Sequence, residues 1–197
     1  MDHKIKDGIL SNYLRKTRFK KVTPLIKGNK ILDVGCDEGN IIPYLDRNIN
    51  YTGIDGRQES LDKARKNYPT HKFINIFLTP DNLNKLSKEQ FDAILLIAVL
   101  EHTPNPIKLL KNLQTILTPE GRIIITSPAK KSHWLLVLLS KIGLVRNDKH
   151  EHGFYINNSM ISTLGKEGIY NTIVRKRFQL GLNQLWVLQN REQNVEG

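Results

Sequence analysis

The chain has 197 residues, of which 39% are hydrophobic and 25% charged, and its formal net charge is +11. This composition is typical of one soluble globular domain that can bury a sizeable core. The single cysteine, Cys36, excludes an internal disulfide framework, and the first residues do not open an apolar signal segment, so we expect a cytoplasmic protein.

The first thirty residues are strongly basic. They hold nine Lys or Arg residues against Asp2 and Asp7, a local charge of +7. Apolar residues recur there at roughly helical spacing, which predicts an amphipathic helix that ends near Pro24. Its basic face is either the solvated side of a capping helix or a docking surface for an anionic substrate, a membrane surface or RNA.

The rest of the chain is organised around the segment 31–40. A short apolar run that carries Asp33 passes into a turn with Gly35 and Gly39, and a helix is predicted over 40–47. Gly35 allows the backbone to turn sharply, and Gly39 allows the following segment to approach the sheet. In open α/β sheets, a nucleotide-like ligand binds where such a strand meets such a turn.

A second predicted strand, residues 51–56, ends at Asp55, twenty residues after Gly35. An acid there can accept hydrogen bonds from both hydroxyls of a ribose, an arrangement shared by nicotinamide dehydrogenases and class I S-adenosylmethionine-dependent methyltransferases. The first turn resembles the methyltransferase form D/E-x-G-x-G-x-G, whereas the third dinucleotide glycine is missing because residue 38 is Glu. The resemblance implies that S-adenosylmethionine is bound by Asp33, Gly35, Cys36, Asp37, Gly39, Asp55 and Gly56.

Asp37 departs from this pattern, since the methyltransferase motif has its middle glycine there. Aspartate enters the left-handed backbone region more easily than most residues, so we expect the turn to form. Its charge would lie near the methionine carboxylate of the cofactor unless the side chain faces a cationic group. We therefore predict that Asp37→Gly changes the affinity for the cofactor.

A helix over 58–68 and a third strand over 72–76 follow. In the methyltransferase family, an acid just after this strand commonly meets the adenine amino group. Asn75 is the nearest polar residue here, and its amide oxygen can accept the same hydrogen bond without a charge.

The segment that begins at Phe91 is an almost continuous apolar run, typical of a central strand of a buried parallel sheet. It runs through Ile97, which we include among the cofactor contacts, to Glu101 and His102. The block resembles the FD-x-I and LEH-x-x-x-P motifs of methyltransferases related to quinone biosynthesis. A predicted helix over 107–117 and a turn and strand over 118–128 match the same family, so the resemblance covers about residues 20–128.

The cofactor is already an activated methyl donor, so the protein must mainly hold the acceptor in line with it. His102 is the candidate general base, or else it fixes the loop after the strand. Glu101 is placed on the acceptor side, where it would orient the methionine end or the next helix. The absence of a [DN]-P-P-[YF] motif and of a second cysteine favours O- or C-methylation of a small molecule, with small amines left open.

In the last third, residues 133–145 are apolar almost all round but too few to span a bilayer. They predict a lid helix over the substrate cavity or an interfacial segment that engages a lipid-linked substrate. His150, His152 and Tyr155 are further substrate candidates, and no metal site is predicted because the two histidines lack a third ligand nearby. A helix over 159–166, capped by Asn158 or Ser159, and a closing hairpin over 172–179 and 184–189 complete the chain.

We thus predict an α/β fold with a Rossmann-like, doubly wound sheet of seven mostly parallel strands and a C-terminal antiparallel hairpin. The predicted function is methyl transfer from S-adenosylmethionine to a small-molecule or lipid-linked acceptor, with peripheral contact to a membrane surface. An RNA methyltransferase, a catalytically silent binding module and, least favoured, a dehydrogenase stay open as alternatives. One domain, 1–197, would comprise a basic cap (1–28), a cofactor core (29–128), a substrate lid (129–170) and the hairpin (171–190).

Overall fold

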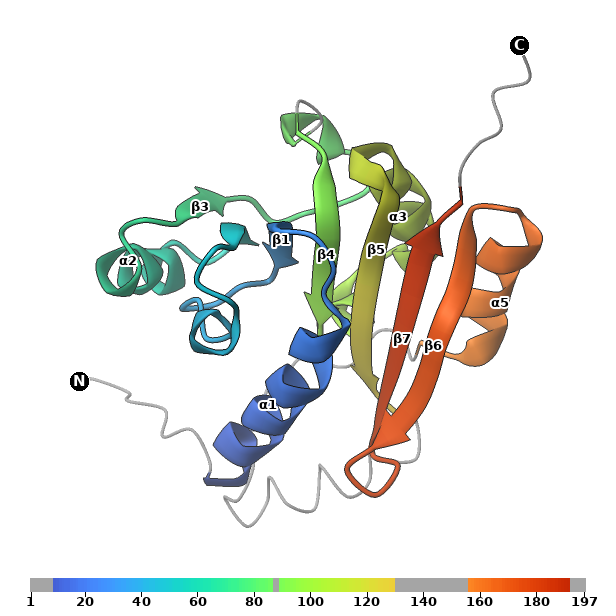
Figure 1. Cartoon of the computed structure of the whole chain (residues 1–197), viewed down its shortest axis with the longest axis horizontal. Coiled ribbons are helices and arrows are strands. Elements are labelled where there is room, and N and C mark those ends of the chain that lie inside the picture. The colour runs from blue at the N-terminus through green and yellow to red at the C-terminus, as the bar shows by residue number, and fades with distance from the viewer. Residues whose placement is uncertain (1–8, 87–88, 130–155, 192–197) are drawn as a thin grey trace.

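The computed structural model describes residues 9–86, 89–129 and 156–191 (Figure 1). A seven-stranded sheet forms its centre, with the strand order β3-β2-β1-β4-β5-β7-β6. The first five strands in this order pair in parallel, and β7 pairs antiparallel with both β5 and β6. The predicted fold class and the closing hairpin are therefore confirmed. The strands are β1 Lys30–Val34, β2 Asn50–Asp55, β3 Lys72–Asn75, β4 Phe91–Ile97, β5 Leu117–Pro128, β6 Tyr170–Phe178 and β7 Asn183–Asn190.

Four α-helices accompany the sheet in the described part of the chain: α1 Ile9–Val22, α2 Gln58–Asn67, α3 Pro106–Leu113 and α5 Asn158–Lys166. Helix α1 confirms that the basic N-terminal segment is helical and ends near Pro24. Short 3-10 helices link these elements: η1 Thr23–Leu25, η2 Ile42–Tyr44, η3 Leu83–Lys85, η4 Leu100–His102 and η5 Gln114–Ile116.

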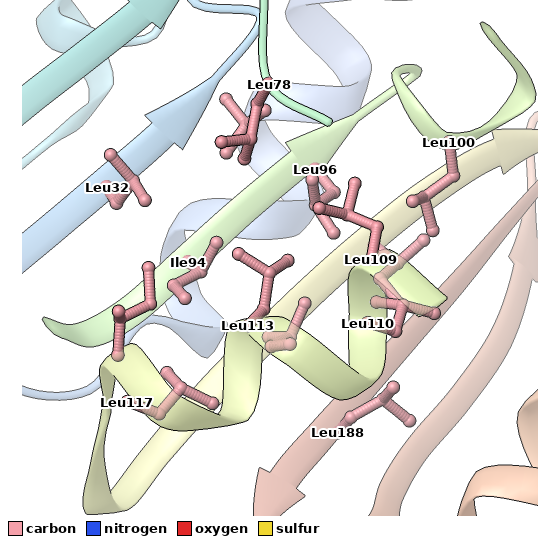
Figure 2. Packing of buried hydrophobic residues seen from close by; sticks show 14 of the residues in the cluster. Leu32, Leu78, Ile94, Leu96, Leu100, Leu109, Leu110, Leu113, Leu117 and Leu188 are labelled. Atoms are coloured by element: carbon pink, nitrogen blue, oxygen red, sulfur yellow. The ribbon is translucent and has the colours of Figure 1, made fainter. Parts of the chain in front are cut away.

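The core lies on both faces of the sheet because successive strand side chains point to opposite faces. On one face, Ile94 and Leu96 of β4 pack with Leu109 and Leu113 of α3, as Figure 2 shows. On the other face, Leu95 of β4 belongs to a cluster that contains residues of α1 and α2. Burial of these strands on both faces explains why they are almost continuous apolar runs in the sequence.

The strand order reverses between β1 and β4, which lie side by side in the centre of the sheet. The chain runs outward from β1 to β3 on one side and from β4 to β5 on the other. At such a switch point, the loops that leave the carboxyl ends of the two strands diverge, and a crevice forms between them. The glycine turn after β1 and the η4 turn after β4 both begin at this edge.

Three local predictions differ from the structure. The helix expected over 40–47 is only the 3-10 turn η2, because Pro43 cannot donate the N–H that an α-helix needs and Leu45 is extended. Helix α3 ends at Leu113, earlier than predicted, and β5 already starts at Leu117. The N-cap of α5 is Asn157, which accepts a hydrogen bond from the Met160 N–H.

Asn158, one of the two predicted caps of α5, instead accepts a hydrogen bond from the Trp186 indole at 3.2 Å. The predicted lid helix over 133–145 and the candidates His150, His152 and Tyr155 lie outside the described residues. Within the described ranges, no helix has both the length and the apolar character needed to cross a membrane.

Candidate active site

The turn after β1 has the left-handed backbone that its sequence predicts. Gly35, Asp37 and Gly39 have φ values of 70°, 52° and 74°. A Cβ atom on Gly35 would also lie 2.8 Å from the Val99 side chain, so the position requires glycine for two reasons. Asp37 adopts the conformation of the missing middle glycine, as expected for aspartate.

Asp55 lies at the carboxyl end of β2 with only 8% of its surface exposed. Its Oδ2 atom accepts the backbone N–H of Asp37 at 3.0 Å, and its Oδ1 atom accepts the backbone N–H of Arg57 at 2.9 Å. These two backbone donors fix the plane of the carboxylate. A carboxylate held in this way beside a glycine turn fits the hydroxyls of a ribose.

Asp33 and Cys36 are the buried side chains at the start of the turn. The Tyr51 hydroxyl donates a hydrogen bond to the Asp33 carboxylate at 2.7 Å. Burial raises the pKa of Asp33 to about 7, although the Tyr51 hydrogen bond opposes this effect, and the charges of Asp55 and Asp37 add to it. Burial also raises the pKa of the Cys36 thiol, so this cysteine is not a nucleophile.

The predicted adenine side lies at the ends of β2 and β3. Asn75 pairs with Asp55 in the register of the two strands, and its amide donates to the side chain of Gln58 at 2.8 Å. Gly56 lies against Phe77, because a Cβ atom on Gly56 would come within 3.1 Å of the Phe77 Cβ. Phe77 is 64% exposed and was missed in the sequence, since one aromatic residue after a strand gives no periodic signal.

On the other side of the crevice, β4 ends at the half-buried Ile97, and Ala98 adopts a left-handed φ of 58°. The η4 turn that follows places Glu101 inside the protein and His102 at the surface. Burial raises the pKa of Glu101 to about 7, although its own backbone N–H, the Arg18 charge and the Ser127 hydroxyl oppose the rise. Glu101 and His102 therefore have different environments despite being adjacent.

Glu101 belongs to a set of buried polar atoms at the ends of β4, β5 and β7. Its Oε2 atom, the hydroxyl of Thr126 and the Oδ1 atom of Asn183 have no hydrogen-bond partner among the described residues, and the Ser127 hydroxyl lies close enough to Glu101 to lower the pKa of its carboxyl. All four residues are at most 4% exposed. Because buried polar groups in native proteins nearly always have partners, the Oε2 atom of Glu101 can bind a polar ligand.

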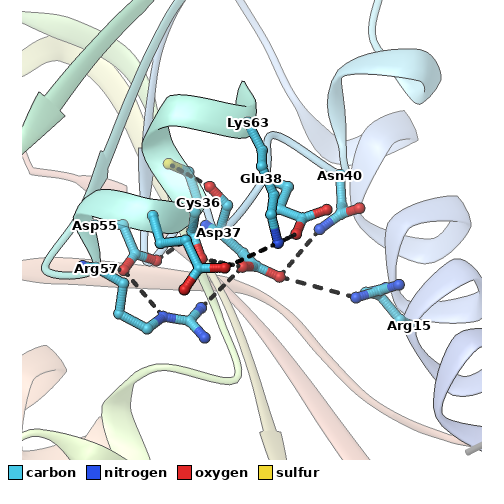
Figure 3. Close-up of polar contacts among 10 residues, drawn as sticks. Arg15, Cys36, Asp37, Glu38, Asn40, Asp55, Arg57 and Lys63 are labelled. Carbon is cyan, nitrogen blue, oxygen red and sulfur yellow. Dashed lines mark hydrogen bonds and ion pairs between the residues drawn. The ribbon is translucent and has the colours of Figure 1, made fainter. Parts of the chain in front are cut away.

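The structure brings together residues that sequence reasoning did not connect. Figure 3 shows the Asp37 carboxylate between Arg15 of α1 and Arg57 at the start of α2. The positive charge of Arg18, also on α1, lowers the pKa of Glu101. Two arginines of the basic N-terminal segment thus face the site, while Lys16 and Lys20 are exposed. No local pattern could reveal these contacts, because the partners are far apart in the sequence.

No group of three or more His, Cys, Asp or Glu residues suited to a metal ion occurs in the ranges that the structure describes. The described residues around the glycine turn offer carboxylates, hydroxyls and backbone amides. This set fits an adenosyl ligand, since Asp55 can accept the ribose hydroxyls and the left-handed turn lets the backbone approach it closely.

Comparison with known proteins agrees with this geometry. Residues 2–167 match the family model described as a methyltransferase domain. The ubiquinone biosynthesis O-methyltransferase of Actinobacillus pleuropneumoniae is 28% identical over 154 residues, which cover 74% of this chain and 66% of that protein. The chain thus spans slightly less than two thirds of this relative.

Two solved structures share the fold. An S-adenosylmethionine-dependent methyltransferase from Archaeoglobus fulgidus has a TM-score of 0.70 and 14% identity, with 91% of this chain and 95% of that chain covered. The N-methyltransferase NodS from Bradyrhizobium japonicum, in complex with S-adenosyl-l-homocysteine, has a TM-score of 0.60 and 17% identity, with coverages of 96% and 92%. These likenesses show the fold, and the family match shows that the chain belongs to the methyltransferase domain family, with S-adenosylmethionine as the cofactor that the glycine turn and Asp55 fit.

Proposed function

We propose that this protein transfers the methyl group of S-adenosylmethionine to an oxygen or carbon atom of a small-molecule or lipid-linked acceptor. The observation that carries the proposal is the position of the buried polar set around Glu101. It lies at the ends of β4 and β5, next to the crevice in which the glycine turn and Asp55 would hold the cofactor.

The cofactor supplies an activated methyl group, so the residues of this chain have three tasks. Asp55 binds and orients the ribose, and the turn at Gly35 and Gly39 lets the backbone approach the cofactor. The buried polar set, which includes Glu101 and Ser127, binds the acceptor and excludes water from it. Holding the two reactants in line accounts for most of the acceleration that such a transfer needs.

A hydroxyl acceptor must also lose a proton. We assign this step to His102, because it is exposed and lies next to Glu101 in η4, the turn that follows the carboxyl end of β4. The unperturbed pKa of histidine lies near neutrality, which suits a general base. Support for oxygen as the methylated atom comes from the name of the Actinobacillus relative, an O-methyltransferase.

The same proposal includes a cytoplasmic location and contact with a membrane surface. A cytoplasmic enzyme that contacts a membrane surface from one side would reach lipid-linked acceptors. The exposed lysines of α1, among them Lys16 and Lys20, supply the positive charge for such a contact.

The first test is calorimetric titration of the purified protein with S-adenosylmethionine, S-adenosylhomocysteine and NAD. We expect both adenosyl ligands to bind and NAD not to bind. Asp55→Asn should weaken adenosyl binding at least tenfold, a loss of roughly 1.5 kcal/mol or more for a charged hydrogen-bond acceptor. Asp46→Asn is the matched control, because Asp46 is exposed and follows η2, outside the turn 35–39.

The second test measures formation of S-adenosylhomocysteine with a panel of phenols, catechols and their prenylated forms. We expect turnover with at least one hydroxylated aromatic acceptor. His102→Gln should lower kcat about 100-fold or more while leaving the calorimetric affinity for the cofactor unchanged. Binding of the adenosyl ligands without turnover on any acceptor would instead support the silent binding module.

A further inference from the structure

We infer that Arg57 is a positioning residue of the cofactor site: it shares its side chain between Asp37 and Asp55, and it gives up Asp55 when a ribose binds. This inference rests on the proposed function, because it concerns the same cofactor site. It explains how the site can still bind the cofactor although a carboxylate replaces the middle glycine.

The first step concerns the charge of Asp37. Its Oδ1 atom accepts hydrogen bonds from Arg57 Nη2 and from Ser60 Oγ, both at 2.9 Å. Its Oδ2 atom accepts a hydrogen bond from Asn40 Nδ2 at 3.1 Å and lies 3.9 Å from Arg15 Nη1. The side chain is thus directed toward donors on α1, α2 and the turn itself, and its charge is compensated within the protein.

The second step concerns the other contact of Arg57. Its Nε atom lies 3.4 Å from Asp55 Oδ1, the same oxygen that accepts the Arg57 backbone N–H at 2.9 Å. One guanidinium therefore bridges two carboxylates, one in the turn after β1 and one at the end of β2 (Figure 3). The Nε contact is long, so it is the weakest of the bonds around the bridge.

The third step is a competition for Asp55. A carboxylate oxygen offers about two lone-pair positions, and one position on each Asp55 oxygen is taken by a backbone N–H. The ribose hydroxyls need the remaining positions, and Arg57 Nε already uses Oδ1. Because the Arg57 side chain is 57% exposed and that of Asp55 only 8%, it is Arg57 that can move.

The charge on Asp37 determines how readily Arg57 leaves Asp55. With Asp37 ionised, the guanidinium keeps a short contact at 2.9 Å after its Nε atom has been displaced. With a neutral residue at position 37, Asp55 is the stronger of the two partners, and Arg57 competes more effectively with the ribose. Asp37 therefore assists cofactor binding through Arg57 rather than by contact with the cofactor.

The test is a double-mutant cycle with adenosine and S-adenosylhomocysteine as calorimetric probes. Adenosine has the ribose but no charge, so it reports the competition at Asp55 alone. We expect Arg57→Ala to tighten adenosine binding about threefold and Asp37→Asn to weaken it about threefold, as for an exposed ion pair. In the Arg57→Ala background, Asp37→Asn should change the affinity less than twofold, because the competitor is gone.

The matched control is Arg65→Ala, which removes another ion pair of α2, with Asp62, and touches neither Asp37 nor Asp55. Asn suits position 37 because it tolerates the left-handed backbone. If Arg57→Ala does not fold, as judged by circular dichroism, Arg57→Gln replaces it, since this variant keeps a donor for Asp37 without the charge.

Weaker adenosine binding in Arg57→Ala would overturn the inference, because Arg57 would then contact the nucleoside directly. An equal effect of Asp37→Asn in both backgrounds would overturn it as well, because Asp37 would then act without Arg57. Failure of the proposed function is distinguished by the unmodified protein: if it binds neither adenosyl ligand, the cofactor assignment fails before the cycle begins.

Discussion

The buried carboxyl of Glu101 predicts a pH dependence of stability that a single variant removes. Burial raises its pKa from the ordinary 4.5 to about 7 in the folded chain. Between these pH values, the folded state holds a proton that the unfolded state has released, so stability falls as the pH rises. At 1.36 kcal/mol for each pH unit, the loss is roughly 3 kcal/mol above pH 7.

Glu101→Gln keeps the shape of the side chain but cannot ionise. The free energy of unfolding of the variant, relative to that of the unmodified protein, should therefore rise by roughly 3 kcal/mol between pH 4.5 and pH 8. Urea unfolding at several pH values in this window, followed by circular dichroism, measures the difference. Asp33 titrates in both proteins with a pKa of about 7, so its contribution cancels.

Glu120→Gln is the control, because it removes a carboxylate that is exposed rather than buried. It should not reproduce the change of roughly 3 kcal/mol, because Glu120 is not buried. A difference between Glu101→Gln and the unmodified protein that stays constant from pH 4.5 to pH 8 would refute the reasoning, because it would mean that water or a cation keeps Glu101 ionised.

Two further predictions concern the turn and the adenine side. Tyr51→Phe removes the hydroxyl that stabilises the Asp33 carboxylate, so the pKa of Asp33 should rise further. The variant should therefore lose about 1 kcal/mol more stability at pH 8 than at pH 5. Equal losses in urea titrations at the two pH values would contradict this role. Phe77→Ala should weaken S-adenosylhomocysteine binding by about 1–2 kcal/mol in calorimetry, as for loss of a base-stacking ring, while the equally exposed Tyr13→Ala should not. Unchanged affinity in Phe77→Ala would place the adenine away from this ring.

Much of the fold was predictable because its signals are local. The buried parallel strands are apolar runs, as from Phe91 to Ile97, and these need no knowledge of the rest of the chain. The spacing of Gly35, Gly39 and Asp55 predicted the cofactor side of the site for the same reason. The carboxyl ends of parallel strands lie at the same edge of the sheet, so residues that follow two such strands in the sequence lie close together in the fold.

The predictions that failed depended on details within one turn. A helix over 40–47 looks reasonable by composition, but Pro43 limits the segment to one 3-10 turn. The predicted cap of α5, Asn158 or Ser159, was one or two residues too late, because three consecutive residues, Asn157, Asn158 and Ser159, can all cap a helix. Only the tertiary contact with Trp186 decides that Asn158 is used elsewhere.

The contacts of Asp37 were beyond sequence reasoning for a different reason. The sequence correctly raised the question of its charge, but the answer depends on Arg15 and Arg57, which lie about twenty residues away on either side. Arginines in a basic chain are common, and nothing in their spacing marks the two that face the turn. Packing of α1 and α2 against the same face of the sheet brings them there.

The site is acidic, whereas the whole chain is basic. Asp33, Asp37 and Asp55 converge on one turn in a protein of net charge +11, and the latter two raise the pKa of the first. S-adenosylmethionine carries a sulfonium cation that its product lacks. Arg15 lies beside Asp37, and Arg57 is shared between Asp37 and Asp55, so three acids face two arginines and we expect the site to favour the cationic donor over the neutral product. The same groups that bind the cofactor before transfer would thus assist release of S-adenosylhomocysteine afterwards, and the net charge of the chain gives no guide to this balance.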